Sequence, residues 1–359
     1  MTTVRHLSPE HMDPEGFRKL LSPFNPLTEP NSKALVAVKH HPGEEGNSSY
    51  VTPEMLELVL DSLELPAGRT YLTDTTVLYG GRRMVAPDYV SLAWEHGFTT
   101  PRFPPFIVAD GLTVTEEYRV CLPDCCITPE ARLAGALQNT GYAVMVSHFK
   151  GHLLAGFGGS IKHLGMGWAS KAGKLYQHSS VAPSIRTDKC TGCMACEGVC
   201  GSNAIKDSSG RTEIDRNSCT GCGECLQICP FGAIGISWNQ EADTFMTRMT
   251  EYALAASMAV KIPLYINFLT KVSPDCDCMR NEGPPMVADL GVLASGDPVA
   301  IDQASLDLVT AAEPVGDNAP AGKDKFRHVR PDRNGTLQLE TGERIGLGKR
   351  AYELIRITP

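Results

Sequence analysis

The feature that most constrains this chain is a pair of cysteine runs near its middle. The first run holds Cys190, Cys193, Cys196 and Cys200, and the second holds Cys219, Cys222, Cys225 and Cys229. Both have the spacing C-x2-C-x2-C-x3-C, and Pro230 follows the second. Three cysteines with two residues between neighbours can each bind a different metal atom of one cluster, whereas the fourth lies too far along the chain to join them. A segment of this kind folds around what its thiolates bind.

This spacing is typical of bacterial ferredoxins with two clusters, in which the fourth cysteine of each run ligates the cluster of the other run. It predicts two [4Fe–4S] clusters. Cluster 1 is expected to use Cys190, Cys193, Cys196 and Cys229. Cluster 2 is expected to use Cys219, Cys222, Cys225 and Cys200. The alternatives are structural zinc or disulfides, but zinc sites use CxxC pairs rather than CxxCxxC runs.

Composition and charge place further limits on partners and compartment. The 359 residues are enough for two or three domains. A net charge of −8 gives no electrostatic reason to expect nucleic acid or an anionic membrane as a partner. The N-terminus lacks the apolar segment of a secretory signal, and no 18-residue apolar run predicts a membrane span. Because clusters need thiolates, we predict a cytoplasmic protein in a reducing, anaerobic cell.

Strand and helix patterns alternate on both sides of the cysteine runs. Before them we expect strands at 34–39, 69–74, 106–111 and 142–148, and helices at 52–63, 88–96 and 131–138. After them we expect a helix at 241–261, strands at 263–269, 286–293 and 352–357, and a helix opened by Asp297 and Pro298. The pattern predicts an α/β fold with a mostly parallel sheet flanked by helices and an inserted two-cluster ferredoxin-like (α+β) module.

The domain boundaries follow from this pattern. Residues 1–33, rich in proline, are expected to form an irregular N-terminal arm with one short helix at 14–21. Residues 34–183 form the first part of the α/β domain, 184–238 the two-cluster module, and 239–359 the second part of the α/β domain.

Polar residues end four of the expected strands. These are His40, Asp74, Asp110 and His148. Because ligands of open α/β sheets bind at the carboxyl ends of the strands, we expect the four residues to line one crevice. The alternative is that polar residues simply mark the places where loops begin.

A glycine-rich stretch at 149–182 adds to this candidate site. Six glycines lie from Gly151 to Gly167. Lys162 lies among them, and Lys171 and Lys174 follow them. Glycines allow close approach of the backbone to a ligand, and backbone N–H groups with lysines bind anions. We therefore expect a small-molecule or anionic ligand at Gly156–Gly167, with a glycine-rich surface loop as the alternative.

The residues proposed for catalysis come from this stretch and from the strand ends. They are Asp74, His148, Lys150, His152 and Lys162. A metal shared by His148 and His152 is the less favoured interpretation, because the glycine between them argues against a helix that would align them.

Cys276 and Cys278 form a candidate third metal site. Two cysteines separated by one residue face the same way in an extended segment and could bind a metal or a substrate electrophile. The like charge of Asp275 and Asp277 would raise the pKa of both thiols unless a cation is present. The alternative is a pair of reduced surface thiols.

Several segments together resemble the family described as "domain of unknown function 362", here carrying a two-cluster ferredoxin module. They are Leu72–Tyr79, His148–His152, Gly156–Gly167, Asp275–Cys278 and Gly296–Ser305. The resemblance covers nearly everything after residue 33 and implies an α/β core, a ferredoxin portion and a redox role in anaerobes, but no substrate. One departure is Gly201 after Cys200, where ferredoxins usually have proline; its absence is expected to affect the turn but not the ligand.

The sequence supports more than one function. The favoured hypothesis is an electron carrier that passes electrons through its clusters to a partner oxidoreductase. The alternative is an iron–sulfur reductase that acts on a small molecule bound in the glycine-rich crevice, with a third metal at Cys276 and Cys278. A weaker possibility is a metal or cofactor maturation factor.

Overall fold

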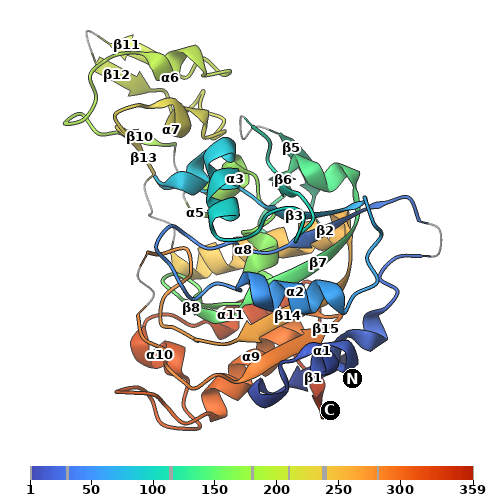
Figure 1. The fold of residues 1–359 in the computed structure, drawn as a ribbon. Coiled ribbons are helices and arrows are strands. Elements are labelled where there is room, and N and C mark those ends of the chain that lie inside the picture. Colours follow the sequence, from blue (N-terminus) through green and yellow to red (C-terminus); the bar gives the residue numbers. More distant parts are fainter. Residues whose placement is uncertain are drawn as a thin grey trace.

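A computed structural model of the chain describes residues 2–29, 32–112, 116–178, 182–208, 211–236, 241–280 and 283–358. Its body is built on an eight-stranded sheet of order β16-β1-β15-β14-β7-β2-β3-β4 (Figure 1). β15 is antiparallel to both of its neighbours, and all other neighbouring strands are parallel. The predicted α/β fold with a mostly parallel sheet is therefore confirmed. The strands are β1 (Thr2–Leu7), β2 (Leu35–Lys39), β3 (Thr70–Asp74), β4 (Phe106–Val108), β7 (Thr140–His148), β14 (Lys261–Leu269), β15 (Gly291–Ser295) and β16 (Tyr352–Ile357).

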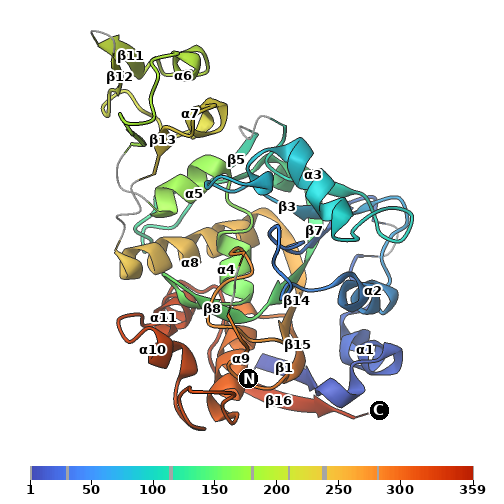
Figure 2. The same cartoon turned by 60° about the vertical axis from the view of Figure 1, so that its left-hand side comes forward.

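Helices cover both faces of this sheet because both faces are apolar (Figure 2). Along β7, Val144 and Val146 pack on one face while Ala143 and Met145 pack on the other, which is the period of two expected for a strand buried on both sides. The first face is covered by α1 (Pro14–Leu21), α2 (Pro53–Asp61) and α3 (Ala86–Glu95). The second is covered by α4 (Ser160–Gly165), α8 (Ala242–Ala259), α9 (Pro298–Ala311) and α11 (Thr336–Arg344).

Two helix starts follow directly from capping residues. The Thr52 hydroxyl accepts a hydrogen bond from the Met55 N–H, and Pro53 is the first residue of α2. The Asp297 carboxylate accepts from the Val299 and Ala300 N–H groups at the start of α9. Both starts lie where the sequence predicted them.

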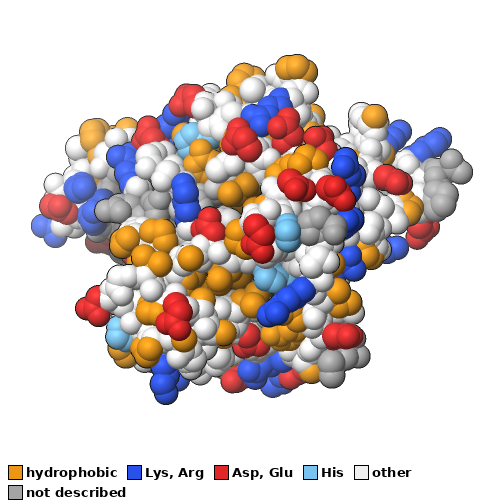
Figure 3. All heavy atoms as spheres, turned by 60° about the horizontal axis from the view of Figure 1, so that its bottom comes forward, with side chains coloured by type: hydrophobic (Ala, Val, Ile, Leu, Met, Phe, Trp, Pro, Cys, Tyr) orange, Lys and Arg blue, Asp and Glu red, His pale blue; other side chains and the backbone are white. Residues whose placement is uncertain are grey.

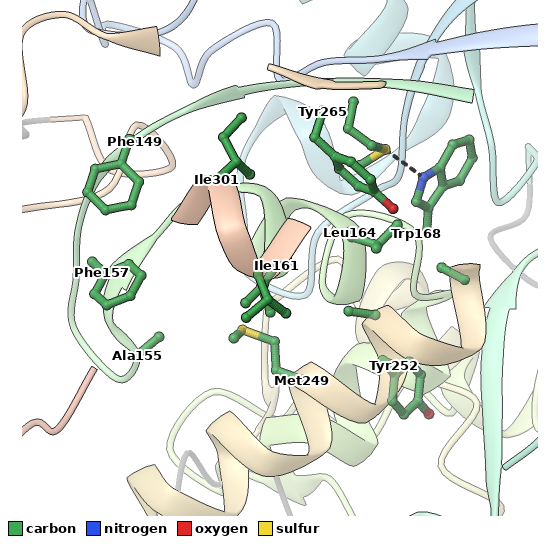
Figure 4. Packing of buried hydrophobic residues seen from close by; sticks show 14 of the residues in the cluster. Phe149, Ala155, Phe157, Ile161, Leu164, Trp168, Met249, Tyr252, Tyr265 and Ile301 are labelled. Carbon is green, nitrogen blue, oxygen red and sulfur yellow. Dashed lines mark hydrogen bonds between the residues drawn. The ribbon is translucent and has the colours of Figure 1, made fainter. Parts of the chain in front are cut away.

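The core between α4 and α8 depends on a close helix contact (Figure 4). A Cβ at Gly165 would lie 2.0 Å from the Met249 carbonyl oxygen, so only glycine fits there. Trp168 is fully buried beside this contact, and its indole N–H donates to the Met145 sulfur over 3.3 Å. This packing fixes α4, which carries Lys162, against the rest of the body.

The cysteine runs form a small unit of their own, here called the cysteine segment (residues 184–236). It projects from the body beside α5 (Lys171–His178) in both ribbon views (Figures 1 and 2). Its elements are β10 (Ser184–Ile185), α6 (Ala195–Gly198), β11 (Ile205–Ser208), β12 (Arg211–Ile214), α7 (Glu224–Ile228) and β13 (Ile234–Gly235). Leu78 and Leu175 of the body belong to the same hydrophobic cluster as Cys225 and Leu226, so the segment is packed on the body.

The structure differs from the sequence predictions at several elements. Residues 1–33 were expected to be an irregular arm, but β1 pairs with β15 and β16 inside the sheet, and α1 matches the short helix expected at 14–21. Residues 131–138 were expected to be helical, but they form β6 (Glu130–Ala134) and a 3-10 turn at Gly135–Asn139. β6 pairs with β5 (Glu117–Cys121), and such pairing outweighs weak helical periodicity in a short segment.

The glycine-rich stretch is also not a surface loop. It contains β8 (Lys150–His152), β9 (Gly156–Gly158), α4 and α5, which are largely buried. The strand expected at 286–293 begins later, at Gly291. Residues 313–335, rich in proline, glycine and aspartate, were expected to form a loop, but they contain α10 (Lys325–Val329). The last predicted residues of the inserted module, 237 and 238, lie outside the described residues.

Figure 3 shows one face of the molecule, on which acidic, basic and hydrophobic side chains intermingle. Within the described part of the chain, no helix is both long and apolar enough to cross a membrane.

Candidate functional site

Two cavities in the cysteine segment gather the eight cysteines in two sets of four. One is lined by Cys190, Cys193, Cys196 and Cys229, together with apolar residues such as Ile185 and Ile234. The other is lined by Cys200, Cys219, Cys222 and Cys225, together with Ile205 and Ile214. In each cavity three cysteines come from one run and the fourth comes from the other run. These are the two sets expected from the spacing.

The backbone repeats itself around the two cavities. Left-handed conformations occur at Gly192, Met194 and Asn203, and again 29 residues later at Gly221, Gly223 and Gly232. Cys200 accepts a hydrogen bond on its carbonyl from the Asn203 N–H, and Cys229 accepts the matching one from Gly232. The turn after Cys200 therefore forms without the proline that follows Cys229. The two halves are two copies of one local structure.

Backbone N–H groups point at the fourth cysteine of each run. The Ala204 N–H donates to the Cys200 sulfur, and the Ala233 N–H donates to the Cys229 sulfur, each over 3.2 Å. Partial burial acts to raise the pKa of both thiols, but these and neighbouring hydrogen bonds outweigh it and lower the pKa below the usual value. The pKa of Cys225 is instead raised to about 12, by burial and by the neighbouring cysteines. A metal centre bound there would have to supply the charge that favours this thiolate.

All thirteen cysteines are free thiols in the structure. Among the described residues, no three or more His, Cys, Asp or Glu side chains form a group that could hold a single metal ion. A [4Fe–4S] cluster is bound differently. Each of its four irons takes one cysteine, so the four cysteine sulfurs stay apart around the cluster. Four thiols, an apolar lining and N–H donors to sulfur are suited to such a group.

A second polar site lies at the carboxyl ends of the strands, centred on Asp74. Lys39 at the end of β2 places its ammonium 2.6 Å from Asp74 Oδ1, and both residues are buried. Tyr89 donates to the other carboxylate oxygen, from which Arg83 lies 3.8 Å. Although burial acts to raise the pKa of Asp74, the positive charges of Lys39 and Arg83 hold it well below the usual value. Asp74 is therefore a buried anion held by buried cations.

Arg83 links this anion to a second one, Asp277. Its guanidinium contacts Glu44 over 3.0 Å and lies 2.9 Å from Nε2 of His41. The same His41 nitrogen lies 4.0 Å from Asp277 Oδ1. Burial lowers the pKa of His41 well below its usual value, and Arg83 adds to this effect, so the ring is neutral. The two carboxylates belong to one continuous network.

Asp277 lies beside two residues of neighbouring strands, His148 at the end of β7 and Lys150 in β8. Lys150 places its ammonium 3.1 Å from Asp277 Oδ1 and donates to the His148 carbonyl over 2.7 Å. His148 Nε2 lies 2.7 Å from the Thr270 carbonyl, which can only accept, so this nitrogen carries a proton. Its other nitrogen, Nδ1, lies 3.5 Å from Asp277 Oδ2. The imidazole therefore lies beside the carboxylate as a second polar group, after Lys150.

Cys276 lies beside Asp277 and faces Lys162 of α4. The Lys162 ammonium donates to the Cys276 sulfur over 3.4 Å, and Asp277 Oδ1 lies 3.3 Å from that sulfur. The hydrogen bond with the Cys278 thiol and the charge of Lys162 outweigh burial and lower the pKa of Cys276 to about 6. The sequence argument expected a raised pKa unless a cation was present. The structure supplies cations of its own, Lys162 and Lys150 here, and Arg330 beside Asp275.

The cysteine pair is not the pair of surface thiols considered as an alternative. Cys276 is 3% exposed and Cys278 is half-buried. The segment is a turn rather than an extended strand. Whether it binds a metal stays a prediction, and the ammonium of Lys162 already provides positive charge to the sulfur.

Of the catalytic candidates, the structure brings together Asp74, His148, Lys150 and Lys162. His152 differs, because its Nδ1 accepts from the Leu154 and Ala155 N–H groups of its own turn and its ring stacks on Phe245. His148 and His152 share no partner in these contacts. Asp110 accepts from the Thr76 N–H and hydroxyl beside Asp74.

His40 has another environment. Its ring packs at a tilt of 58° against Phe98, 4.6 Å between centroids, and both ring nitrogens are buried without a hydrogen-bond partner. Burial lowers the pKa of His40 to about 3. Lys171 and Lys174, expected to form an anion nest, instead bond protein oxygens: Lys171 donates to the Met84 carbonyl, and Lys174 donates to Thr75 and Thr76.

The sequence analysis missed Lys39, His41 and Arg83 as site residues. Lys39 ends a predicted strand and was counted only as part of that strand, although its position directly before His40 was a usable signal. Arg83 lies in a loop with no motif, so nothing in the sequence placed it beside Asp74.

The polar site adjoins the cavity of Cys200, Cys219, Cys222 and Cys225. Leu78 packs in the cluster that includes Cys225, and the next residue, Tyr79, donates to the Cys278 carbonyl over 3.3 Å. Gly223, beside Cys222, lies against Lys171, and Arg132 of β6 donates to the Thr220 carbonyl over 3.0 Å. Leu78 and Tyr79 of the body thus join the hydrophobic cluster that includes Cys225 to the Cys276–Cys278 turn.

Comparison with known proteins gives one family. The family described as "Domain of unknown function (DUF362)" matches residues 36–307. No curated protein matches the chain. Among solved structures, the lactate racemase apoprotein from Thermoanaerobacterium thermosaccharolyticum is similar, with 13% identity and a TM-score of 0.39. The match covers 75% of this chain and 51% of that protein, so the chain spans about half the length of that protein.

Proposed function

This chain belongs to the family described as "Domain of unknown function (DUF362)", and we propose that it is an iron–sulfur protein that transfers electrons through two [4Fe–4S] clusters to a partner oxidoreductase. The thiolates it needs place it in a reducing compartment, the cytoplasm.

The observation that carries the proposal is the exchange of cysteines between the two cavities. Cys229 lies with the first run and Cys200 lies with the second, as the ligand sets of two-cluster ferredoxins require. Zinc would need four donors close enough to bind one ion, and the described residues contain no such group. The 29-residue repeat of left-handed positions supports a duplicated cluster-binding unit.

In this account the residues around each cavity have defined tasks. The eight cysteines hold the clusters, which supply one-electron redox chemistry when bound. Ile185 and Ile234 exclude water from one set, and Ile205 and Ile214 exclude it from the other. The N–H groups of Ala204 and Ala233 donate to sulfur and so favour the more negative, reduced state. Exposed Ile228 and Phe231, on both sides of Cys229, offer an apolar contact to a redox partner.

Reductive titration tests the proposal. The anaerobic protein is titrated with dithionite and followed by EPR, and two electrons per chain are expected to enter, one for each cluster. Both should leave again to a one-electron acceptor such as a viologen of higher potential. A protein that takes up no electrons contradicts the proposal.

A second candidate, a reductase that acts on a small molecule, is favoured by one observation. Lys150, Lys162 and His148 converge on Asp277 and Cys276, an arrangement that a simple carrier does not need. Turnover of a small molecule by the isolated protein with dithionite would support the reductase. A stable oxidoreductase partner and no turnover would support the carrier. The maturation factor stays a prediction.

A further inference from the structure

Cys276 and Cys278 are held in one tight turn. The Met279 N–H donates to the Cys276 carbonyl over 2.8 Å, which closes a four-residue turn around Asp277. Within it the Cys278 N–H donates to the Cys276 sulfur over 3.4 Å, so this sulfur lies against the backbone of the second cysteine. Two cysteines this close in one turn can form a disulfide with little backbone movement.

The surroundings of the turn suit one negatively charged sulfur. Lys162 donates to Cys276 over 3.4 Å, and Lys150 balances the charge of Asp277. Cys276 is buried, whereas Cys278 is half-buried and followed by exposed Met279. Cys278 is therefore the more accessible of the two cysteines.

The turn is also connected to the cysteine segment. Tyr79 donates to the Cys278 carbonyl, and its neighbour Leu78 packs in the cluster that includes Cys225. Two clusters together hold two electrons, and reduction of one disulfide needs two.

We propose that Cys276 and Cys278 are a redox-active dithiol that takes two electrons from the two clusters and passes them to a disulfide of a partner molecule. This proposal rests on the proposed electron-transfer function and names its acceptor.

The step balances as follows. The Cys276–Cys278 disulfide takes one electron from each cluster and one proton, its S–S bond breaks, and the products are a thiolate at Cys276 and a thiol at Cys278. In the other direction, Cys278 releases its proton to solvent and attacks the partner disulfide, and one partner thiolate leaves, while Cys276 stays a thiolate. Cys276 then attacks Cys278 in the mixed disulfide, the second partner thiolate leaves, and the internal disulfide is formed again.

The test uses the full-length anaerobic holoprotein with reduced clusters and oxidised glutathione as the probe. With excess oxidised glutathione we expect the EPR signals of both wild-type clusters to disappear and four glutathione thiols to form per chain, two from the electrons of the clusters and two from the dithiol itself. Cys276→Ser should trap a mixed disulfide with glutathione at Cys278, seen by mass spectrometry, because the resolving sulfur is gone. Cys278→Ser should slow cluster oxidation at least 100-fold and form no adduct.

The matched control is Cys121→Ser, which removes an exposed thiol outside the site and should behave as the wild type. Equal rates in the wild type and in Cys278→Ser would overturn the proposal. So would a metal ion beyond the clusters that is lost from both variants, since it would make the pair a third metal site. The glutathione adduct forms without any cluster, so missing EPR signals would count against the electron-transfer function, and a missing adduct against the dithiol alone.

Discussion

The ammonium of Lys162 lies 3.4 Å from the sulfur of Cys276, although 114 positions separate the two residues in the chain. The contact joins the glycine-rich stretch to the Cys276–Cys278 turn. α4 carries Lys162, and its close packing on α8 through Gly165 places the ammonium. Gly165 of this stretch thus helps to position a side chain at the sulfur, and the ligand expected at Gly156–Gly167 stays a prediction.

This packing predicts a large cost for a small substitution. In Gly165→Ala the new Cβ would lie 2.0 Å from the Met249 carbonyl oxygen, so α4 and α8 must move apart. We expect a loss of about 2–4 kcal/mol in the free energy of unfolding, in the range for overpacked or strained core sites, measured by anaerobic urea denaturation. Gly80→Ala is the control, because nothing lies within 4 Å of its Cβ position. Equal stability of the two variants would contradict the packing described.

The buried Lys39–Asp74 pair predicts a difference from ion pairs at the surface. Lys39→Met leaves the Asp74 carboxylate buried with less compensation, and we expect a loss of about 3–5 kcal/mol in the free energy of unfolding. Arg82→Ala breaks ion pairs with the exposed Asp88 and Glu95 and should cost at most about 1 kcal/mol. Similar urea midpoints for the two variants would show that Lys39 does not stabilise Asp74 as a buried anion.

Asp302 predicts a pH dependence of stability. Its carboxylate is fully buried and accepts from the Ser160 and Ile161 N–H groups and from Asn267, and burial outweighs these bonds and raises its pKa from 3.8 to about 6. Between pH 4 and 6 the unfolded chain has released this proton while the folded protein keeps it. Stability from Asp302 is therefore present below pH 4 and is lost as pH rises through 6, by about 3 kcal/mol.

Asp302→Asn removes this titration. The wild type minus the variant should give a free-energy difference that falls between pH 4 and 6 and stays flat above 6, measured by urea denaturation at each pH. Asp307→Asn, on the exposed side of the same helix, should leave the pH profile of the wild type unchanged. A difference that does not vary between pH 4 and 7 would contradict the raised pKa.

The sequence predicted those features that depend on short-range spacing. The cysteine sets, the parallel sheet and the capped starts of α2 and α9 all follow from residues close together in the chain. The helix predicted at 131–138 was wrong because a segment as short as β6 carries too little periodicity to separate strand from helix. The pairing of β6 with β5 is a tertiary contact. β1 was missed because residues 1–33 hold many prolines, whereas its strand precedes all of them.

The candidate site was only partly predictable for the same reason. Asp74 and His148 were found because they end predicted strands. Lys39 was included in an apolar strand, and Arg83 reaches Asp74 and Glu44 from a loop whose path depends on the whole fold. The charge balance of Cys276 depends on Lys162, which comes from an element that the sequence assigned to a loop.

Iron and sulfide counts in paired cysteine variants test the central claim most directly. Cys196→Ser/Cys229→Ser removes two residues of one cavity, whereas Cys225→Ser/Cys229→Ser removes one from each. For the anaerobically purified wild type we predict eight irons and eight sulfides, as two cubanes require. The first double variant should keep about four of each, and the second should keep close to none. Iron and sulfide counts well below eight in the wild type would contradict the presence of two clusters. Equal losses of iron in the two double variants would contradict the exchange of ligands between them.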